Sequence, residues 1–366
     1  MKSILLLANG PGELWGWVRP VAAELKRRSR KVSLLLLPCQ FASGEERRVA
    51  ESLVPDELRG PSGLAGTLRD ALSLGRTAEA VLQLGGDLVW GRIAAGAGRA
   101  PLLCYAYGRK NGLSRCDRVF TAFPAMAEAM GERVRVAGDL VRDSLALDGP
   151  FPSGEGEDRS VLFFPGSRAA IREFSFPFLK EMLPFLKKNA PEWRFRIVLS
   201  PFSTQGEEAV WQSAGFSTAR GAEAFRGAGF AVTQPGTNTL ELMHRGIPFC
   251  VLVPFASLRK VPLPGLPGLI ASLPGIGPRF REAALRRRRR KMELLAWPNR
   301  LAGRMMAEEC IGDYSPETAA EAVIPWLRDR SRRDTLRDAL GETAASAPSG
   351  AAARIADETE RMTVRV

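Results

Sequence analysis

The chain has few of the residues on which metal and nucleophile chemistry usually depend. It contains one histidine, His244, so a histidine metal centre or a Ser-His triad lacks its raw material. Its five cysteines are an odd number and form no Cys-x-x-Cys pair, which argues against a disulfide framework and against a zinc site. We therefore predict no metal and no cofactor, and expect carboxylates to perform any proton transfer.

Long hydrophobic runs are also missing. No uncharged apolar segment reaches the length of about 18 residues that spans a bilayer. The apolar opening of residues 1–8 stops at Asn9-Gly10, too early for the apolar region of a signal peptide. We interpret it as a buried first strand and predict a cytoplasmic protein.

What the chain does have is an ordinary globular composition, 45% hydrophobic and 25% charged, over 366 residues. That length favours two domains. Short apolar runs alternate with segments of helical spacing, such as 18–28 and 239–245, which is typical of parallel sheets in α/β domains. The runs expected to be strands are 4–8, 32–37, 81–84, 102–105, 118–121, 161–164, 195–199, 230–233 and 249–253.

The Gly-, Pro- and charge-rich residues 146–160 divide this pattern in two and are the best linker candidate. We predict an α/β fold of two Rossmann-like, doubly wound domains, at 1–150 and 160–343, followed by a C-terminal tail at 344–366. The domains are expected to face a cleft, with ligands at the carboxyl ends of the strands.

A net charge of +12 implies an anionic partner, and most of that charge lies in residues 255–297. Ten basic residues against two acidic ones give this segment +8, beside apolar stretches broken by Pro and Gly. Such a segment suits a surface on anionic lipid, and a solvated basic loop is the alternative. Nucleic acid is not expected, because the basic run has no interleaved aromatic residues.

Two segments have the composition of phosphate-binding turns. Phe-Phe-Pro-Gly-Ser-Arg at 163–168 follows an expected strand, and its backbone N–H groups with Arg168 could hold a diphosphate; a generic turn is the alternative. Thr-Gln-Pro-Gly-Thr-Asn-Thr-Leu-Glu at 233–241 joins a glycine turn to a helix start, where Glu241 could accept hydrogen bonds from ribose. Simple N-capping by Thr237 or Asn238 is the alternative there, and capping and ligand binding can coexist.

A third segment, Trp-Pro-Asn-Arg-Leu-Ala-Gly-Arg at 297–304, directly follows the basic segment. Asn299 would be a helix N-cap in its purely structural role. These three segments, in this order, resemble the C-terminal half of the bacterial lipid-A-disaccharide synthases. That family has a Leu-Pro-Gly-Ser-Arg turn, a Ser-Gly-Thr-x-Thr-Leu-Glu helix start and a Leu-Pro-Asn-Leu-Leu-Ala-Gly-Arg segment with similar spacing.

The resemblance implies an inverting, metal-independent glycosyltransferase of the two-domain GT-B type. Such an enzyme would move a 2,3-diacylglucosamine unit from UDP to a lipid monosaccharide phosphate in lipid A biosynthesis, at the cytoplasmic face of the inner membrane. The resemblance implies that Arg168 and the Gly236-Thr237 turn receive the diphosphate, that Glu241 holds the ribose, and that Asn299 and Arg304 complete the nucleotide site. The full set of expected donor-site residues is Gly166, Ser167, Arg168, Gln234, Gly236, Thr237, Asn238, Thr239, Glu241, Asn299 and Arg304.

The N-terminal half departs further from the family. Ala-Asn-Gly-Pro-Gly-Glu at 8–13 stands where the family has Gly-Glu-x-Ser-Gly-Asp, and Asp139 stands where it has a histidine. In Leu-Gly-Gly-Asp-Leu-Val-Trp at 84–90, Asp87 matches an acid that the family retains and follows an apolar run. We predict Asp87 as the general base, with an N-cap as its alternative role, and Glu13 as the second candidate.

Three other functions remain open. The chain could be a GT-B transferase acting on a different lipid-linked acceptor, such as the peptidoglycan N-acetylglucosaminyltransferase. It could be a relative of the UDP-N-acetylglucosamine 2-epimerases. It could also be a catalytically silent UDP-sugar-binding protein, because the N-terminal motif has diverged.

Overall fold

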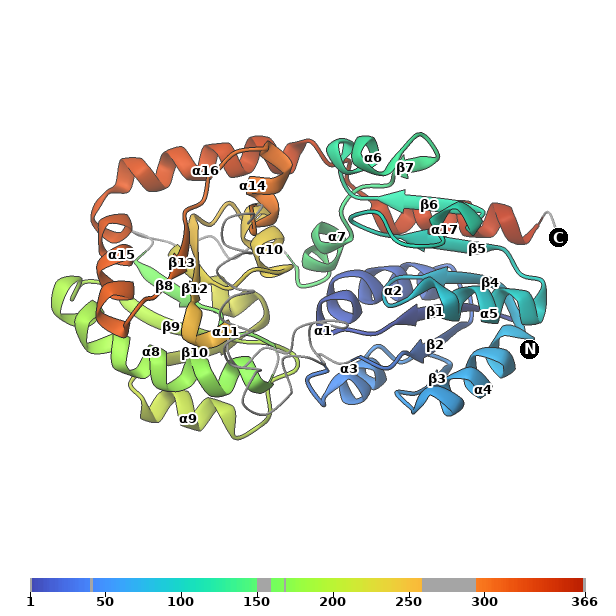
Figure 1. Ribbon diagram of the computed structural model, residues 1–366, viewed down its shortest axis with the longest axis horizontal. Coiled ribbons are helices and arrows are strands. Elements are labelled where there is room, and N and C mark those ends of the chain that lie inside the picture. The colour runs from blue at the N-terminus through green and yellow to red at the C-terminus, as the bar shows by residue number, and fades with distance from the viewer. Residues whose placement is uncertain (1, 40–41, 150–158, 168, 259–293, 365–366) are drawn as a thin grey trace, which may run out of the picture. The chain divides into compact units, whose positions relative to one another are not determined.

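The chain folds into two compact units (Figure 1). The computed structural model describes residues 2–39, 42–149, 159–167, 169–258 and 294–364. Unit 1 comprises Met1–Phe151, Ser200–Gln205 and Glu342–Val366, and unit 2 comprises Pro152–Leu199 and Gly206–Gly341. Each unit is built on one parallel β-sheet with helices, so the predicted α/β class with two Rossmann-like domains is confirmed.

Unit 1 contains a seven-stranded sheet in the order β3-β2-β1-β4-β5-β6-β7. Its inner strand β1 is buried, since Ile4 to Ala8 have no exposed surface and pack on both faces of the sheet. The strands are β1 (Ser3–Ala8), β2 (Val32–Leu36), β3 (Glu57–Arg59), β4 (Ala78–Gln83), β5 (Leu102–Tyr105), β6 (Arg118–Thr121) and β7 (Val134–Val136).

The helices of unit 1 follow most of these strands, as parallel connections require. One segment, η1 (Leu14–Val18), is a π-helix inserted between α1 and α2. The other helices are α1 (Pro11–Glu13), α2 (Arg19–Arg27), α3 (Glu46–Ser52), α4 (Leu64–Gly75), α5 (Leu88–Gly98), the 3₁₀ turn η2 (Leu113–Arg115), α6 (Pro124–Met130), α7 (Leu140–Ala146) and α17 (Ala351–Thr363).

Unit 2 contains a six-stranded sheet in the order β10-β9-β8-β11-β12-β13. Its strands are β8 (Ser160–Phe163), β9 (Arg194–Leu199), β10 (Ser217–Arg220), β11 (Ala228–Thr233), β12 (Phe249–Pro254) and β13 (Glu309–Gly312). Its helices are α8 (Ala169–Asn189), α9 (Glu207–Ser213), the 3₁₀ turn η3 (Gly221–Phe225), α10 (Asn238–His244), α11 (Phe255–Leu258), α14 (Trp297–Ala302), α15 (Pro316–Arg328) and α16 (Arg330–Ala345), which continues into unit 1.

The two sheets share one topology. In each, the first strand of the unit lies beside the fourth: β1 pairs with β4, and β8 pairs with β11. The strand order reverses at this point, and the connections leave the first and fourth strands in opposite directions. In open α/β sheets, ligands bind at the carboxyl edge of such a switch point.

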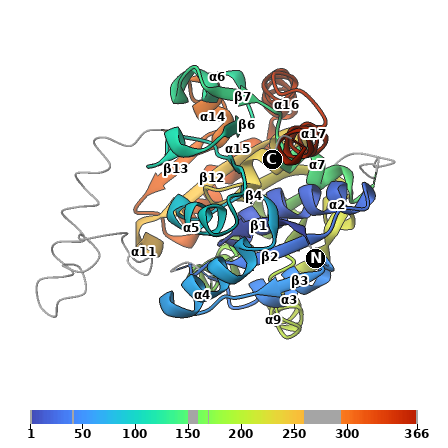
Figure 2. The same cartoon turned by 90° about the vertical axis from the view of Figure 1, so that its right-hand side faces the viewer.

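Residues 344–366, set apart above as a C-terminal tail, contain helix α17 and group with unit 1. The helix packs on α2, α7 and β4 (Figure 2). Arg28, the C-cap residue of α2, joins it through ion pairs to Asp357 at 2.6 Å and Glu360 at 2.9 Å. Among the described helices, none combines the length and the apolar character that crossing a bilayer requires.

Candidate functional site

The turn after β1 carries Glu13, the second candidate base. Glu13 is half-buried at the end of the short helix α1. Gly10 makes room for its carboxylate, because a Cβ at Gly10 would lie 2.4 Å from Glu13 Oε2. Gly10 therefore allows the Glu13 carboxylate its observed position, and a larger residue there would make this carboxylate move.

The turn after β4 carries Asp87, the first candidate base. Asp87 is exposed and is the N-cap of α5, where its Oδ1 accepts a hydrogen bond from the Val89 N–H at 2.9 Å. Gly86 precedes it with φ +74°, a left-handed conformation that glycine adopts without strain. The structural role named above as the alternative for Asp87 is therefore present, and its other oxygen is not engaged by that cap.

These two turns of unit 1 meet at Gly85. A Cβ there would lie 3.0 Å from Glu13 Cγ and 3.1 Å from Asn9 Oδ1. The Asn9 oxygen is buried and accepts no hydrogen bond from any residue that the structure describes. A buried carbonyl without a donor is costly, and a bound hydroxyl would satisfy it. Asn9, which the sequence analysis does not select as a site residue, therefore stands beside Glu13 as a candidate contact for a ligand.

A buried hydrogen-bond chain holds the π-helix that follows Glu13. Trp17 Nε1 donates to the Tyr107 hydroxyl at 3.1 Å, and this hydroxyl donates to Asp139 Oδ1 at 2.6 Å. Asp139 is 1% exposed and also caps α7 by accepting from the Val141 N–H at 3.0 Å. Burial, and then the negative charge of Asp139, raise the pKa of Tyr107 well above its usual value. The hydroxyl therefore stays protonated and available as the donor.

In unit 2, the turn after β8 carries Gly166 and Ser167. Gly166 has φ +97°, and a Cβ there would lie 2.7 Å from Ile171 Cγ2. The Ser167 carbonyl accepts a hydrogen bond from Arg172, whose Nε pairs with Glu207 Oε1 at 3.0 Å. Arg168, the expected diphosphate ligand, lies outside the described residues, as do residues 259–293 of the basic segment.

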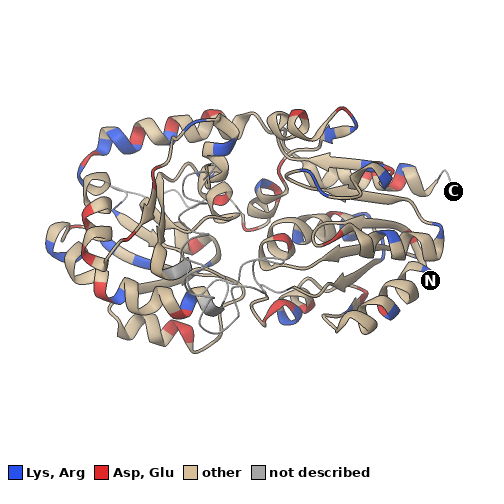
Figure 3. Cartoon of the chain, in the orientation of Figure 1, with Lys and Arg blue, Asp and Glu red and all other residues tan. Residues whose placement is uncertain are grey.

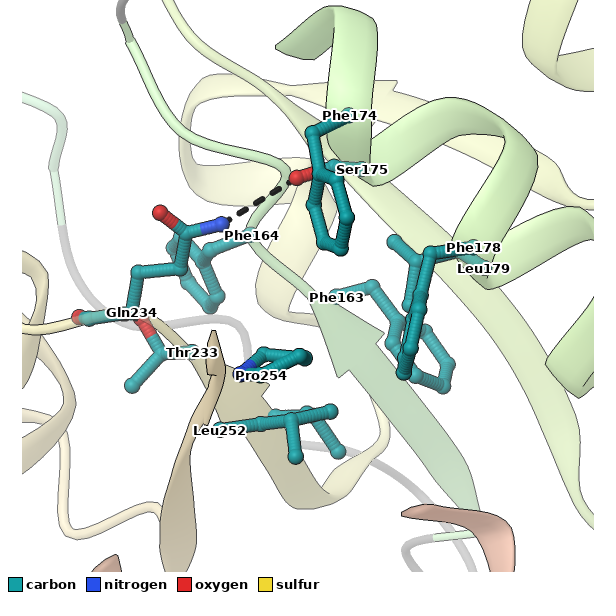
Figure 4. Close-up of a pocket in the computed structure, with 11 residues that line it drawn as sticks. Phe163, Phe164, Phe174, Ser175, Phe178, Leu179, Thr233, Gln234, Leu252 and Pro254 are labelled. Carbon is teal, nitrogen blue, oxygen red and sulfur yellow. Dashed lines mark hydrogen bonds between the residues drawn. The ribbon is translucent and has the colours of Figure 1, made fainter. Parts of the chain in front are cut away.

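Gln234 begins the turn after β11 and faces the β8 turn. A Cβ at Gly166 would lie 3.5 Å from Gln234 Oε1, and Gln234 Nε2 donates to Ser175 Oγ at 3.1 Å. Figure 4 shows this amide at the mouth of a pocket between β8, β11, β12 and α8. Its lining is mostly apolar, and its volume of about 30 Å³ holds water-sized groups rather than a sugar ring. The pocket residues are Phe163, Phe164, Phe174, Ser175, Phe178, Leu179, Val232, Thr233, Gln234, Leu252 and Pro254.

The turn between β11 and α10 is open at its glycine. Gly236 has φ +154°, and a Cβ there would meet no atom within 4 Å. Thr237 is the N-cap residue of α10, which starts at Asn238, and no side chain makes the capping hydrogen bond considered above. Buried Thr239 instead donates to the Gly236 carbonyl at 2.8 Å.

Glu241 has a partner that sequence reasoning missed. Arg245, one turn further along α10, places Nε 3.5 Å from Glu241 Oε1, and its guanidinium lies 4.0 Å from the centre of the Phe225 ring. The side chain of Arg245 is only 5% exposed. The i,i+4 spacing of Glu241 and Arg245 was the available signal. The pair limits the rotation of the Glu241 side chain.

Asn299 is a structural cross-link. It is buried, its Nδ2 donates to the Ala307 carbonyl at 2.7 Å and to Glu309 Oε1 at 2.8 Å, and its Oδ1 accepts from the N–H groups of Met306 and Ala307. The N-cap of α14 is Ala296, so the expectation that Asn299 caps this helix is wrong. Its carboxamide is saturated within the protein, which leaves it a positioning role. Arg304 is exposed beyond the end of α14.

Trp297 connects these donor-side segments, because its N–H donates to Thr239 Oγ1 at 3.2 Å. The structure thus brings Gly166, Ser167, Gln234, Gly236 and Thr239 to the carboxyl edge of one switch point. No cluster of three or more metal-binding side chains occurs among the described residues.

Comparison with known proteins supports the fold. No family model matches the chain, and no curated protein matches it in sequence. Solved structures do match the chain. MurG from Acinetobacter baumannii is similar to it with 17% identity and a TM-score of 0.57, and the match covers 99% of this chain and 100% of that one. The glycosyltransferase VinC in complex with dTDP gives 12% identity, a TM-score of 0.57 and full coverage of both chains (100% each).

A third match is a UDP-N-acetylglucosamine 2-epimerase, with 14% identity, a TM-score of 0.51 and coverage of 97% of this chain and 95% of that one. These similarities extend over both units and place the chain in the GT-B fold, the fold that the sequence analysis predicts. At such identities they establish the fold alone.

Proposed function

We propose that this protein is an inverting glycosyltransferase that uses a UDP-sugar, with the donor bound by unit 2 and the general base supplied by unit 1. One observation supports this division. Both units have glycine turns after their first and fourth strands, but the turns of unit 1 carry the carboxylates Glu13 and Asp87, whereas those of unit 2 carry hydroxyls and an amide.

The donor side has the chemistry that a diphosphate needs. Gly236 leaves the backbone of its turn uncovered, so main-chain N–H groups there can approach phosphate oxygens closely. Ser167 and Thr237 add hydroxyls, Asn238 starts the helix, and Arg168 would add a guanidinium. Glu241, oriented by Arg245, is the proposed acceptor for the ribose hydroxyls.

Glu13 is the better-placed base of the two carboxylates. It is half-buried, and its side chain packs beside Gly85 and the unpaired oxygen of Asn9, which could position an acceptor hydroxyl. Asp87 is exposed and caps α5. We therefore propose Glu13 as the base and keep Asp87 as the second candidate.

The reaction needs one displacement. The carboxylate takes the proton of the acceptor hydroxyl while that oxygen attacks the anomeric carbon. The bond to the UDP oxygen breaks on the opposite face, and UDP departs with the electron pair. A base, a diphosphate site and contacts to the nucleoside suffice for this chemistry, and we propose that no metal or cofactor takes part.

For the acceptor, we propose a lipid monosaccharide phosphate, as the resemblance to lipid-A-disaccharide synthases implies. The basic segment 255–297 supports this choice, because a lipid acceptor is presented at an anionic membrane surface. We propose peripheral association with the cytoplasmic face of the inner membrane.

The experiment is transfer from UDP-2,3-diacylglucosamine to monophosphorylated diacylglucosamine, in detergent with a chelator. We expect a disaccharide and stoichiometric UDP. If disaccharide and UDP form only when a different lipid-linked sugar is supplied, the acceptor is reassigned. If UDP-N-acetylglucosamine is converted to its 2-epimer, the protein is an epimerase and not a transferase. Thermal stabilisation by UDP without turnover on any of these substrates would indicate a silent binder. Loss of turnover in chelator would contradict the metal-free mechanism.

A further inference from the structure

Unit 2 has a second concave surface, at the amino edge of its sheet and so at the opposite strand ends from the donor-site turns. Arg159 immediately precedes β8, and Trp193 immediately precedes β9. The cavity has a volume of about 620 Å³, within the usual range of small-ligand sites. It is lined by Arg159, Glu192, Trp193, Gly229, Leu327, Arg328, Arg330, Arg333, Asp334 and Arg337.

Five arginines and two acidic residues give this lining a net charge of +3. Arg330, Arg333 and Arg337 lie at i, i+3 and i+7 and therefore share one face of α16, the helix whose ribbon carries blue basic positions in Figure 3. The cations come from three parts of the chain: the start of β8, the end of α15 and α16. Their convergence is a property of the fold that no single sequence motif displays.

Three of these arginines donate hydrogen bonds to main-chain carbonyls of the protein. Arg333 Nη1 donates to the carbonyls of Trp326 and Leu327 at 2.6 and 2.8 Å, and Arg328 Nη2 donates to the Asn189 carbonyl at 3.2 Å. Arg337 Nε donates to the Gly246 carbonyl at 3.2 Å. The Trp326, Leu327 and Asn189 carbonyls lie at the ends of α15 and α8, whereas Gly246 follows the C-cap residue of α10. Each of the two helix ends contributes roughly half a negative charge. A positive charge of roughly +2 therefore remains.

The acidic side chains do not neutralise the remainder. Asp334 is shared between two cations, since its carboxylate pairs with Arg337 and lies 3.5 Å from Arg330 Nε. Arg333 is fixed in place over the Trp193 ring at 5.0 Å. Burial lowers the pKa of Arg333, and the neighbouring charges of Arg337 and Arg330 lower it further, against the opposing effect of Asp334. An anion would relieve the repulsion between these guanidinium groups.

We propose that this arginine pocket, defined by Arg159, Arg328, Arg330, Arg333 and Arg337, is a binding site for phosphate groups, separate from the donor site. Guanidinium groups bind phosphate oxygens in a bidentate manner, and Arg333 presents a preorganised one. Arg159 and Arg330 line the same pocket and are exposed to solvent. The phosphate can belong to a free phosphoanion or to the headgroup of an anionic lipid.

The test compares the full-length protein with the double variant Arg159→Gln/Arg330→Gln, which replaces two exposed arginines of the pocket by neutral side chains. Arg226→Gln, an exposed arginine of the same unit outside the pocket, is the matched control. Inorganic pyrophosphate is titrated by calorimetry at low salt in the presence of saturating UDP, so that the donor site is occupied. Sedimentation with vesicles of equimolar phosphatidylcholine and phosphatidylglycerol forms the second arm.

We expect pyrophosphate binding by the parent and the control, and at least about tenfold weaker binding by the double variant. Loss of pyrophosphate binding with unchanged sedimentation assigns a free phosphoanion, whereas reduced sedimentation assigns a lipid headgroup. Parental behaviour of the double variant in both arms would overturn the proposal. If the double variant melts at a lower temperature, Arg330→Gln alone, an exposed residue at the start of α16, decides by the same comparison.

Discussion

The two switch points of this protein have the same topology and different side chains. In unit 1 the turns after β1 and β4 present Asn9, Glu13 and Asp87. In unit 2 the turns after β8 and β11 present Gly166, Ser167, Gln234 and Gly236. The sheet fixes where a ligand can bind, and the turn residues decide whether a proton acceptor or an anion site results.

Glycines serve different purposes in these turns. At Gly10 and Gly85 a Cβ would meet the side chains of Glu13 and Asn9, so these glycines make room for polar side chains of the protein itself. At Gly166 a Cβ would meet Ile171, whereas at Gly236 it would meet nothing, so Gly236 is required for its backbone angle and leaves its turn open. The open space beside a glycine is therefore found at Gly236 of unit 2 and not at Gly10, Gly85 or Gly166.

The largest expected effect comes from removing the proposed base. Glu13→Gln should reduce turnover by a factor of about 10² to 10⁴ with nearly unchanged UDP affinity, because the group acts on the acceptor. Steady-state transfer rates and UDP titration measure the two quantities. Asp87→Asn is the matched control, since asparagine caps a helix as well as aspartate does. A large loss in Asp87→Asn with near-parental turnover in Glu13→Gln would exchange the two roles.

The next effect concerns stability within unit 2. Asn299→Ala removes four hydrogen bonds and leaves the buried N–H and carbonyl of Ala307 without the partner they have in the structure, while Glu309 keeps its hydrogen bonds from the Leu295 and Ala296 N–H groups. We expect a loss of roughly 2 to 4 kcal/mol in the free energy of unfolding, measured by urea denaturation. Exposed Arg304→Ala should change it by less than about 0.5 kcal/mol. If Asn299→Ala keeps full stability and loses UDP binding, Asn299 contacts the nucleotide directly.

A smaller effect should follow from closing a donor-site turn. Gly166→Ala places a Cβ 2.7 Å from Ile171 at φ +97°, which should shift the turn at a cost of about 1 to 2 kcal/mol. If this cost is lost from UDP binding, we expect UDP affinity to fall by about tenfold, because about 1.4 kcal/mol corresponds to a factor of ten in affinity. Gly206→Ala, at a position with φ −76° and free space around it, is the control. Equal UDP affinity in both variants would remove the β8 turn from the donor site.

The smallest expected effect is on the acid stability of unit 1. The hydrogen bond from Arg27, assisted by Arg28 and opposed by burial, lowers the pKa of Glu24 in unit 1 from 4.5 to about 2. Since the folded pKa is the lower one, this contribution to stability is complete above pH 4.5 and is lost as the pH falls toward 2. Glu24→Gln should therefore flatten the acid limb of the stability curve. An unchanged acid limb would show that the pair contributes nothing there.

The sequence predicts the inner strands of both sheets and misses β3, β7, β10 and β13. These four are the edge strands of the two sheets. Inner strands are apolar on both faces and appear as continuous hydrophobic runs, whereas Glu57–Arg59 and Ser217–Arg220 are short, polar and partly exposed. Their pairing is decided by the neighbouring strand, which no local pattern reports.

The site shows the same limit. Glycine turns after apolar runs identify Gly166, Gly236 and Glu13, because strand, turn and helix are adjacent in the sequence. The saturated carboxamide of Asn299 and the unpaired oxygen of Asn9 depend on residues that other segments bring close. Motif spacing locates a turn, but only packing shows whether its polar atoms remain available to a ligand.

Amide hydrogen exchange of the whole protein with and without UDP tests the division between the two switch points most directly. The account predicts slower exchange in the donor-site turns of unit 2, at residues 165–167 and 234–239, and unchanged exchange at residues 9–13 and 84–87 of unit 1. Protection of the unit 1 turns by UDP, with none in unit 2, would contradict it.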